Sequence, residues 1–189
     1  MARATGGILA VVGPTDLQAV GVKHVQRSEW PVPPGHGQIA DRGRIIGYRY
    51  NFFDALALYA TAGEPEGPFQ VFTGVQMFDT ADSAFKWPER SFQITRDFVG
   101  QTQDRFTLID VTETLAPELG DKAMILRIIA TFSGLPCVDI VMASVCRSRE
   151  PMVAAVQVDT VNSKVYRSAV LQLALGMDVR TNGVLTGAQ

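Results

Sequence analysis

The chain has 189 residues, of which 47% are hydrophobic, and this is enough apolar material to build the core of one domain. Its 17 basic and 19 acidic residues give a formal net charge of −2. Such a balance disfavours a nucleic-acid-binding protein and a polybasic membrane anchor, because both need clustered positive charge.

We expect residues 1–40 to form an N-terminal arm and loop. Residues 14–21 are typical of a short helical turn, residues 22–28 of a strand, and the Pro- and Gly-rich residues 31–37 of a stiff loop. The apolar patch near the start has about five residues, against about 7–15 in a signal peptide, so we interpret it as a strap across the core and find no convincing signal peptide. No apolar run approaches the roughly 20 residues of a membrane span.

Residues 41–180 are expected to form a single α+β domain. Residues 44–53 and 69–78 alternate between apolar and polar side chains, which predicts two strands. Asp79 and Thr80 are suitable caps for a helix that runs to about Trp87 and ends at Pro88. Residues 105–112 predict another strand, and residues 119–121 a turn.

Residues 123–158 contain three apolar runs separated by short breaks at 133–136 and 147–150, a pattern typical of an antiparallel meander. Arg127 falls on the opposite parity from Leu126 and Ile128, and Asp139 on the opposite parity from Ile140 and Met142, so we expect the two charged residues to mark the less buried face. Residues 163–177, capped by Asn162 or Ser163, predict a helix over one face of the meander. A loop, the arm or a partner subunit would cover the other face, and residues 181–189 would form an exposed tail.

The predicted fold class is therefore α+β: an antiparallel β-sheet with a C-terminal meander, covered by two or more helices. Cys137 and Cys146 lie nine residues apart on one predicted strand, a span of roughly 30 Å. A disulfide needs Cα atoms about 6 Å apart, so we expect two free and mostly buried thiols.

The sequence contains no strong catalytic motif. Gly35 to Ala40 matches G-x-G-x-x-A but follows two prolines rather than a strand, so we interpret it as a loop. The two histidines, His24 and His36, both lie in the predicted arm. We predict no catalytic residue, no metal site and no cofactor.

Two acidic residues and the two cysteines leave an alternative open. Asp79 and Asp82 would suit a helix cap and a first-turn acid, but paired carboxylates are also used in acid–base catalysis. A hydrolase-type enzyme would use these acids, or a cysteine with a histidine of the arm.

Aromatic side chains gather on the strands predicted at 44–53 and 69–78. They are most simply core residues, but such a cluster also suits an apolar ligand between the sheet and the helix at 163–177. The predicted ligand-binding residues are Tyr48, Tyr50, Phe52, Phe69 and Phe72.

Segments 43–48, 75–85, 119–121 and 171–180 together resemble a family of uncharacterised bacterial exported proteins, many of them lipoproteins. The resemblance covers roughly residues 43–180 and rests on packing and turn residues, so it transfers no catalytic residue. It implies a PsbP/Mog1-like fold and an extracytoplasmic location.

We therefore expect a non-catalytic binding or assembly module that associates with a protein partner or with itself, and that binds no nucleic acid. The alternatives are a carrier of a small apolar ligand and the hydrolase-type enzyme described above.

Overall fold

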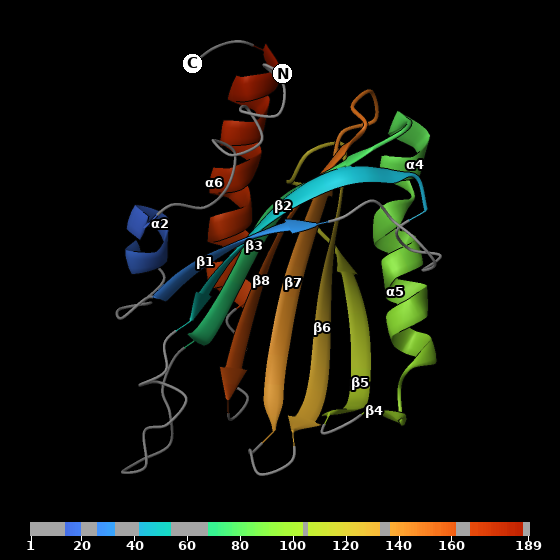
Figure 1. Ribbon diagram of the computed structural model, residues 1–189, viewed down its shortest axis with the longest axis vertical. Coiled ribbons are helices and arrows are strands. Elements are labelled where there is room, and N and C mark those ends of the chain that lie inside the picture. Colours follow the sequence, from blue (N-terminus) through green and yellow to red (C-terminus); the bar gives the residue numbers. More distant parts are fainter. Residues whose placement is uncertain are drawn as a thin grey trace.

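The computed structural model describes residues 14–19, 26–32, 42–53, 68–103, 106–132, 137–161 and 167–186. These residues form one antiparallel sheet of eight strands in the order β1-β2-β3-β8-β7-β6-β5-β4 (Figure 1). The strands are β1 Gln26–Val32, β2 Arg44–Phe53, β3 Pro68–Phe78, β4 Thr102–Gln103, β5 Phe106–Leu115, β6 Lys122–Phe132, β7 Val138–Cys146 and β8 Met152–Val161. The helices are α2 Pro14–Ala19, α4 Ala81–Phe85, α5 Trp87–Asp97 and α6 Arg167–Thr186.

The predicted meander is confirmed as β6, β7 and β8, which lie in the middle of the sheet. The N-terminal strands β1, β2 and β3 form a second antiparallel run, which joins the meander through the pairing of β3 with β8. The α+β class, with an antiparallel sheet and helices against it, is therefore confirmed.

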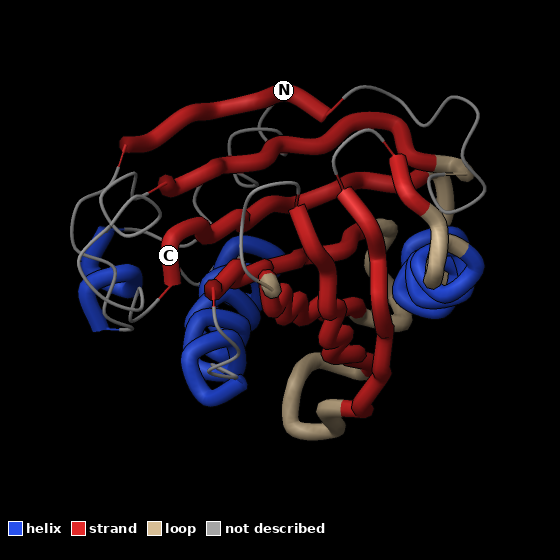
Figure 2. The backbone as a smooth tube through the Cα atoms, turned by 90° about the horizontal axis from the view of Figure 1, so that it is seen from below, coloured by secondary structure: helices blue, strands red, loops and turns tan. Residues whose placement is uncertain are grey.

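Helices cover both faces of the sheet. Figure 2 shows α6 and α5 on opposite sides of a strongly twisted sheet. We call the two faces the α6 face and the α5 face. Because side chains alternate along a strand, neighbouring residues in β2, β3 and β6–β8 belong to different faces.

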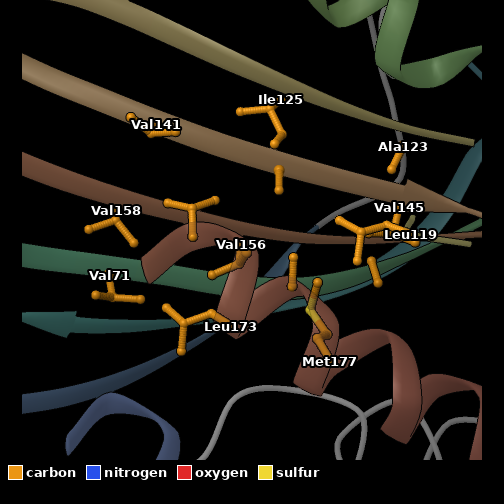
Figure 3. Close-up of a cluster of buried hydrophobic side chains, with 14 of the residues drawn as sticks. Val71, Leu119, Ala123, Ile125, Val141, Val145, Val156, Val158, Leu173 and Met177 are labelled. Atoms are coloured by element: carbon orange, nitrogen blue, oxygen red, sulfur yellow. The ribbon is translucent and has the colours of Figure 1, made fainter. Parts of the chain in front are cut away.

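The main core lies on the α6 face (Figure 3). Leu173 and Met177 of α6 are at most 1% exposed, and they belong to the same buried cluster as Val156 and Val158 of β8 and Ile125 of β6. On the α5 face the packing is divided into smaller clusters. One joins Phe92 of α5 to β5 and β6, and another joins Trp87 to β3, β7 and β8.

The expectation for Arg127 and Asp139 was wrong. Both lie on the α6 face, which holds the main core, and Asp139 is only 1% exposed. Arg127 Nη2 lies 2.8 Å from Asp139 Oδ2, and Arg127 Nε donates to both carboxylate oxygens. A forked guanidinium can satisfy a carboxylate in this way, so the charge can be buried because it is paired.

Several predicted boundaries also differ from the structure. Pro88 does not end a helix; it lies in the first turn of α5, where its missing N–H leaves no helical hydrogen bond unmade. On the other face of the described sheet, α4 packs against β3 and β8, and α5 packs against β5 and β6. Helix α6 continues to Thr186, so the predicted tail at 181–189 is helical over most of its length. Asn162 and Ser163, the predicted caps, lie outside the described residues.

The predicted arm, residues 1–40, contributes β1 to the sheet, and this strand begins at Gln26, later than expected. Both cysteines are free, as predicted; Cys146 is buried and Cys137 is partly buried. None of the described helices is long and apolar enough to cross a lipid bilayer.

Candidate functional site

A cavity of about 240 Å³ lies on the α5 face of the sheet, between strands β2, β3, β7 and β8 and the first turns of α5. It is lined by Arg44, Tyr48, Arg49, Phe72, Thr73, Gly74, Gln76, Trp87, Ser91, Met142, Ala155, Val156 and Gln157. The lining combines guanidinium and amide groups with aromatic and aliphatic side chains, the usual composition of a small-molecule site.

The strand register explains why a hollow forms here. Arg49 faces Gly74 across β2 and β3, and Gly74 faces Ala155 across β3 and β8. The middle of the floor therefore carries a glycine and an alanine, which fill little space. A side chain at Gly74 is excluded, because a Cβ atom would lie 2.6 Å from the carbonyl oxygen of Tyr48.

Arg49 stands at one side of this floor. Its guanidinium carbon lies 3.7 Å from the centroid of the Phe72 ring, a cation–π contact. Burial lowers the pKa of Arg49, and the charge of Asp159 acts against this shift. The side chain is nevertheless exposed overall, and an arginine stays protonated in proteins, so Arg49 is a cation that a ligand can reach.

Asp159 lies in β8, two residues beyond Gln157 and on the same face. It is 6% exposed, and burial raises its pKa to about 7, while the hydrogen bond from Gln157 and the charge of Arg49 act in the other direction. Gln157 Nε2 donates to Asp159 Oδ1 at 2.7 Å. Asp159 is therefore a buried carboxylate beside the cavity whose negative charge is stabilised by one amide hydrogen bond and by the charge of Arg49.

The remaining polar groups form a row along the same face. Arg44 Nη1 donates to Gln76 Oε1 at 3.0 Å, and Gln70 Nε2 donates to Asn51 Oδ1 at 3.1 Å. Trp87 of α5 and Met142 of β7 supply the apolar part of the wall.

The structure does not bring the five predicted ligand-binding residues together. Tyr48 and Phe72 border the cavity. Tyr50 and Phe52 are 1% and 3% exposed and belong to the main core under α6, while Phe69 packs with Val138 in another cluster. The space between these strands and α6 is filled by core side chains, and the cavity lies on the opposite face.

Strand alternation also places Tyr48 on the α6 face, so it borders the cavity through its backbone. Thr73 shows the same arrangement, because its hydroxyl lies 3.6 Å from Met177 Sδ in the main core. The aromatic ring that reaches the cavity from the predicted strands is therefore that of Phe72.

The acids of the catalytic alternative lie at the surface. Thr80, not Asp79, caps α4: its hydroxyl accepts from the backbone N–H of Ser83. A hydrogen bond with the Ser83 side chain is the main cause that lowers the pKa of Asp79, and exposed Asp82 pairs with Lys86 at 2.7 Å. Neither acid lies in the partly dry, concave site that acid–base catalysis would need.

The other version of the catalytic alternative pairs a cysteine with a histidine of the arm. Burial raises the pKa of the Cys146 thiol to about 12, which disfavours the nucleophilic thiolate. His24, His36 and the motif from Gly35 to Ala40 lie outside the described residues. Within the described ranges no group of His, Cys, Asp and Glu side chains could hold a metal ion.

Sequence reasoning missed most of the cavity, including Arg44, Arg49, Trp87 and Gln157. A signal was present, because polar residues occupy one parity of strands whose other parity is apolar: Arg49 and Asn51 in β2, and Gln157 and Asp159 in β8. Two such strands indicate a polar hollow only when they lie close together in the sheet. The pairing of β3 with β8 brings β2 and β8 close, and the local sequence does not reveal this pairing.

The sequence matches no protein-family model, and no curated protein matches it. Among solved structures, the fold is similar to the extracellular domain of PknH from Mycobacterium tuberculosis, with a TM-score of 0.61 and 13% identity over 94% of this chain and 95% of that one. PA94, a Pseudomonas aeruginosa protein of unknown function, aligns over 82% of this chain and 83% of its own at 11% identity, with a TM-score of 0.32. The first likeness shows a shared fold.

Proposed function

We propose that this chain is a non-catalytic binding module that takes a small ligand into the cavity on the α5 face. The observation that carries the proposal is the lining itself: an accessible guanidinium, amide groups and apolar walls meet over a floor of Gly74 and Ala155. The likeness to an extracellular domain and the resemblance to exported proteins support an extracytoplasmic setting for this binding, as part of the same proposal.

Native mass spectrometry of freshly purified protein, followed by a thermal-shift panel of small acids, amines and neutral aromatics, tests the proposal. We expect a copurifying mass or a compound that raises the melting temperature. Ala155→Leu fills the cavity floor and should abolish the shift. Ser168→Leu introduces the same side chain at an exposed position of α6 and should leave the shift intact. The proposal fails if no mass copurifies and no compound stabilises the protein.

A second candidate, self-association, is favoured by the edge of β5. Strand β4 pairs only with Phe106 and Thr107, so residues 109–115 present an edge that no described strand covers. Ile109 is 48% exposed and Leu115 is 67% exposed. Antiparallel pairing with a second copy about Thr112 would place Ile109 opposite Leu115 and would set no acid opposite another acid.

Light scattering after size-exclusion chromatography tests this second candidate. We expect a dimer for the unaltered chain and a monomer for Leu115→Lys, because the substitution sets a charge opposite Ile109. Val179→Lys, at a 69% exposed position of α6, should leave the dimer intact. A monomer at all concentrations would overturn the assembly candidate and would not affect the cavity.

A further inference from the structure

The charge of Arg49 is the feature of the cavity that its surroundings leave least satisfied. Its guanidinium stacks on the Phe72 ring at 3.7 Å, and no hydrogen bond to it comes from the residues that the structure describes. The five N–H donors of a guanidinium lie in its plane, so stacking uses its face and leaves its edges available.

Nothing in the lining neutralises this charge. None of the lining residues is an aspartate or a glutamate. The acid that interacts with Arg49 is Asp159 of β8, outside the lining. Because burial disfavours the charged form of Asp159, it offsets the charge of Arg49 incompletely near neutral pH.

We infer that the ligand carries a compact anionic group, a carboxylate or a phosphate monoester, which binds the open edge of Arg49, and a flat apolar body that lies against Phe72, Trp87 and Met142. This inference rests on the proposed function and names the class of ligand. A carboxylate or phosphate presents oxygens at the spacing of the guanidinium fork, and such charge-assisted pairs are roughly twice as strong as hydrogen bonds between neutral groups. The volume of about 240 Å³ limits the body to a small molecule.

The test uses the two tryptophans of the chain. Trp30→Phe in β1 leaves Trp87, at the cavity wall, as the only fluorescent tryptophan. Because position 30 pairs with Arg49 across β1 and β2, the Arg49 variants and their control are all made in this background. Benzoate, phenyl phosphate and benzamide are then titrated at constant ionic strength. Benzoate and benzamide are nearly the same shape, so their difference isolates the negative charge, and phenyl phosphate distinguishes the two anionic groups.

We expect benzoate or phenyl phosphate to change the Trp87 emission and to bind at least about tenfold more tightly than benzamide, since hydrogen bonds to charged groups are the stronger ones. Arg49→Gln should remove this preference, and Arg49→Lys should keep part of it, because the charge remains while the fork is lost. Arg149→Gln changes an exposed arginine of the β7–β8 turn that does not line the cavity, and it should bind all three probes as the unaltered chain does.

The outcomes separate the inference from the proposed function. If benzamide binds as tightly as benzoate and Arg49→Gln has no effect, the ligand class is wrong while the cavity still binds small molecules. If none of the probes binds and the thermal-shift panel is also negative, both proposals are overturned. Thermal melts of the Arg49 variants accompany each titration, so that a loss of binding through unfolding is recognised.

Discussion

At the scale of single residues, this protein buries charge in two ways. Asp139 is buried with a forked partner, Arg127, whereas Asp159 is buried with an amide donor and a more distant cation. The first arrangement offsets the loss of water with direct ion pairing, and the second does so only in part. Asp159, whose charge is not neutralised by a direct ion pair with a described residue, is the carboxylate that lies beside the cavity.

Asp159 should make stability depend on pH. Its folded-state pKa of about 7 lies above its ordinary value of 3.8, so between these values the folded state holds a proton that the unfolded state has released. The free energy of unfolding should therefore fall as the pH rises through this window and level off above it, by on the order of a few kcal/mol.

Asp159→Asn keeps the shape and the acceptor for Gln157 but removes the titration. Urea melts of both proteins from about pH 4 to about pH 8 isolate the contribution, because every other group titrates alike in the two. The variant should be the more stable protein near pH 8. A difference between the two that does not change with pH would contradict the assignment.

Replacing Gly120, in the turn between β5 and β6, should destabilise the folded protein. Its φ is +54°, and a Cβ atom would lie 2.8 Å from the backbone oxygen of Cys146, which cannot move aside easily. Gly120→Ala should therefore cost about 2–5 kcal/mol, from the left-handed backbone and the collision together.

Gly100 provides the matched control for this substitution. Its φ is +81°, but nothing lies within 4 Å of a Cβ atom built there. Gly100→Ala should cost only the backbone part, about 1–2 kcal/mol. Urea melts compare the two, and equal midpoints would mean that the contact with Cys146 does not constrain the turn.

The sequence could identify several of these residues but not their surroundings. The alternation in residues 44–53 separates Arg49 and Asn51 from Tyr50 and Phe52, and the structure places the two aromatic residues in the core. It could not show which face would receive α6, because that choice depends on packing between distant segments. The aromatic residues therefore looked like one cluster, although the fold divides them between the core and the cavity.

At the scale of elements, α6 is a helix whose sequence is apolar on more than one side. Leu173 is 1% exposed and Leu175 is 44% exposed, although the two are only two positions apart. The pattern therefore located the helix near residues 163–177 but gave its end poorly. The Gly- and Thr-rich residues after Arg180 suggested a tail, whereas Thr181 is buried and the helix continues to Thr186.

The same pair of leucines gives a test of how α6 stabilises the fold. Leu173→Ala should cost about 2–5 kcal/mol, because it removes a fully buried side chain from the main core. Leu175→Ala makes the same change in helix propensity at an exposed position and should stay within about 0.5 kcal/mol. Denaturant melts of the two variants measure the difference. If both variants lose a comparable free energy of unfolding, α6 is not held to the sheet by the side that carries Leu173.

At the scale of the whole molecule, the sheet depends on one pairing between distant segments. Strand β3 ends at Phe78 and β8 begins at Met152, yet the two pair along nearly their whole length and join the N-terminal strands to the meander. Each local run of the meander could be predicted from its turns. The β3–β8 pairing could not, because no turn connects these strands and either could have remained an edge.

This arrangement predicts how backbone amides exchange with solvent. Strand β8 is paired on both sides, by β3 and β7, and supports the main core, so its amides should be exposed only by global unfolding. Amides of β4 and of the outer part of β5 lie at the edge and should exchange through local opening.

Hydrogen exchange measured for the unaltered chain and for Leu173→Ala distinguishes the two modes. In the variant, β8 amides should lose the same free energy of protection that the denaturant melt records, while amides of Thr102 and Gln103 should be unchanged. If the β8 amides of the variant keep their original protection, the two halves of the sheet do not unfold as one cooperative unit, and the β3–β8 pairing is not the junction that holds them together.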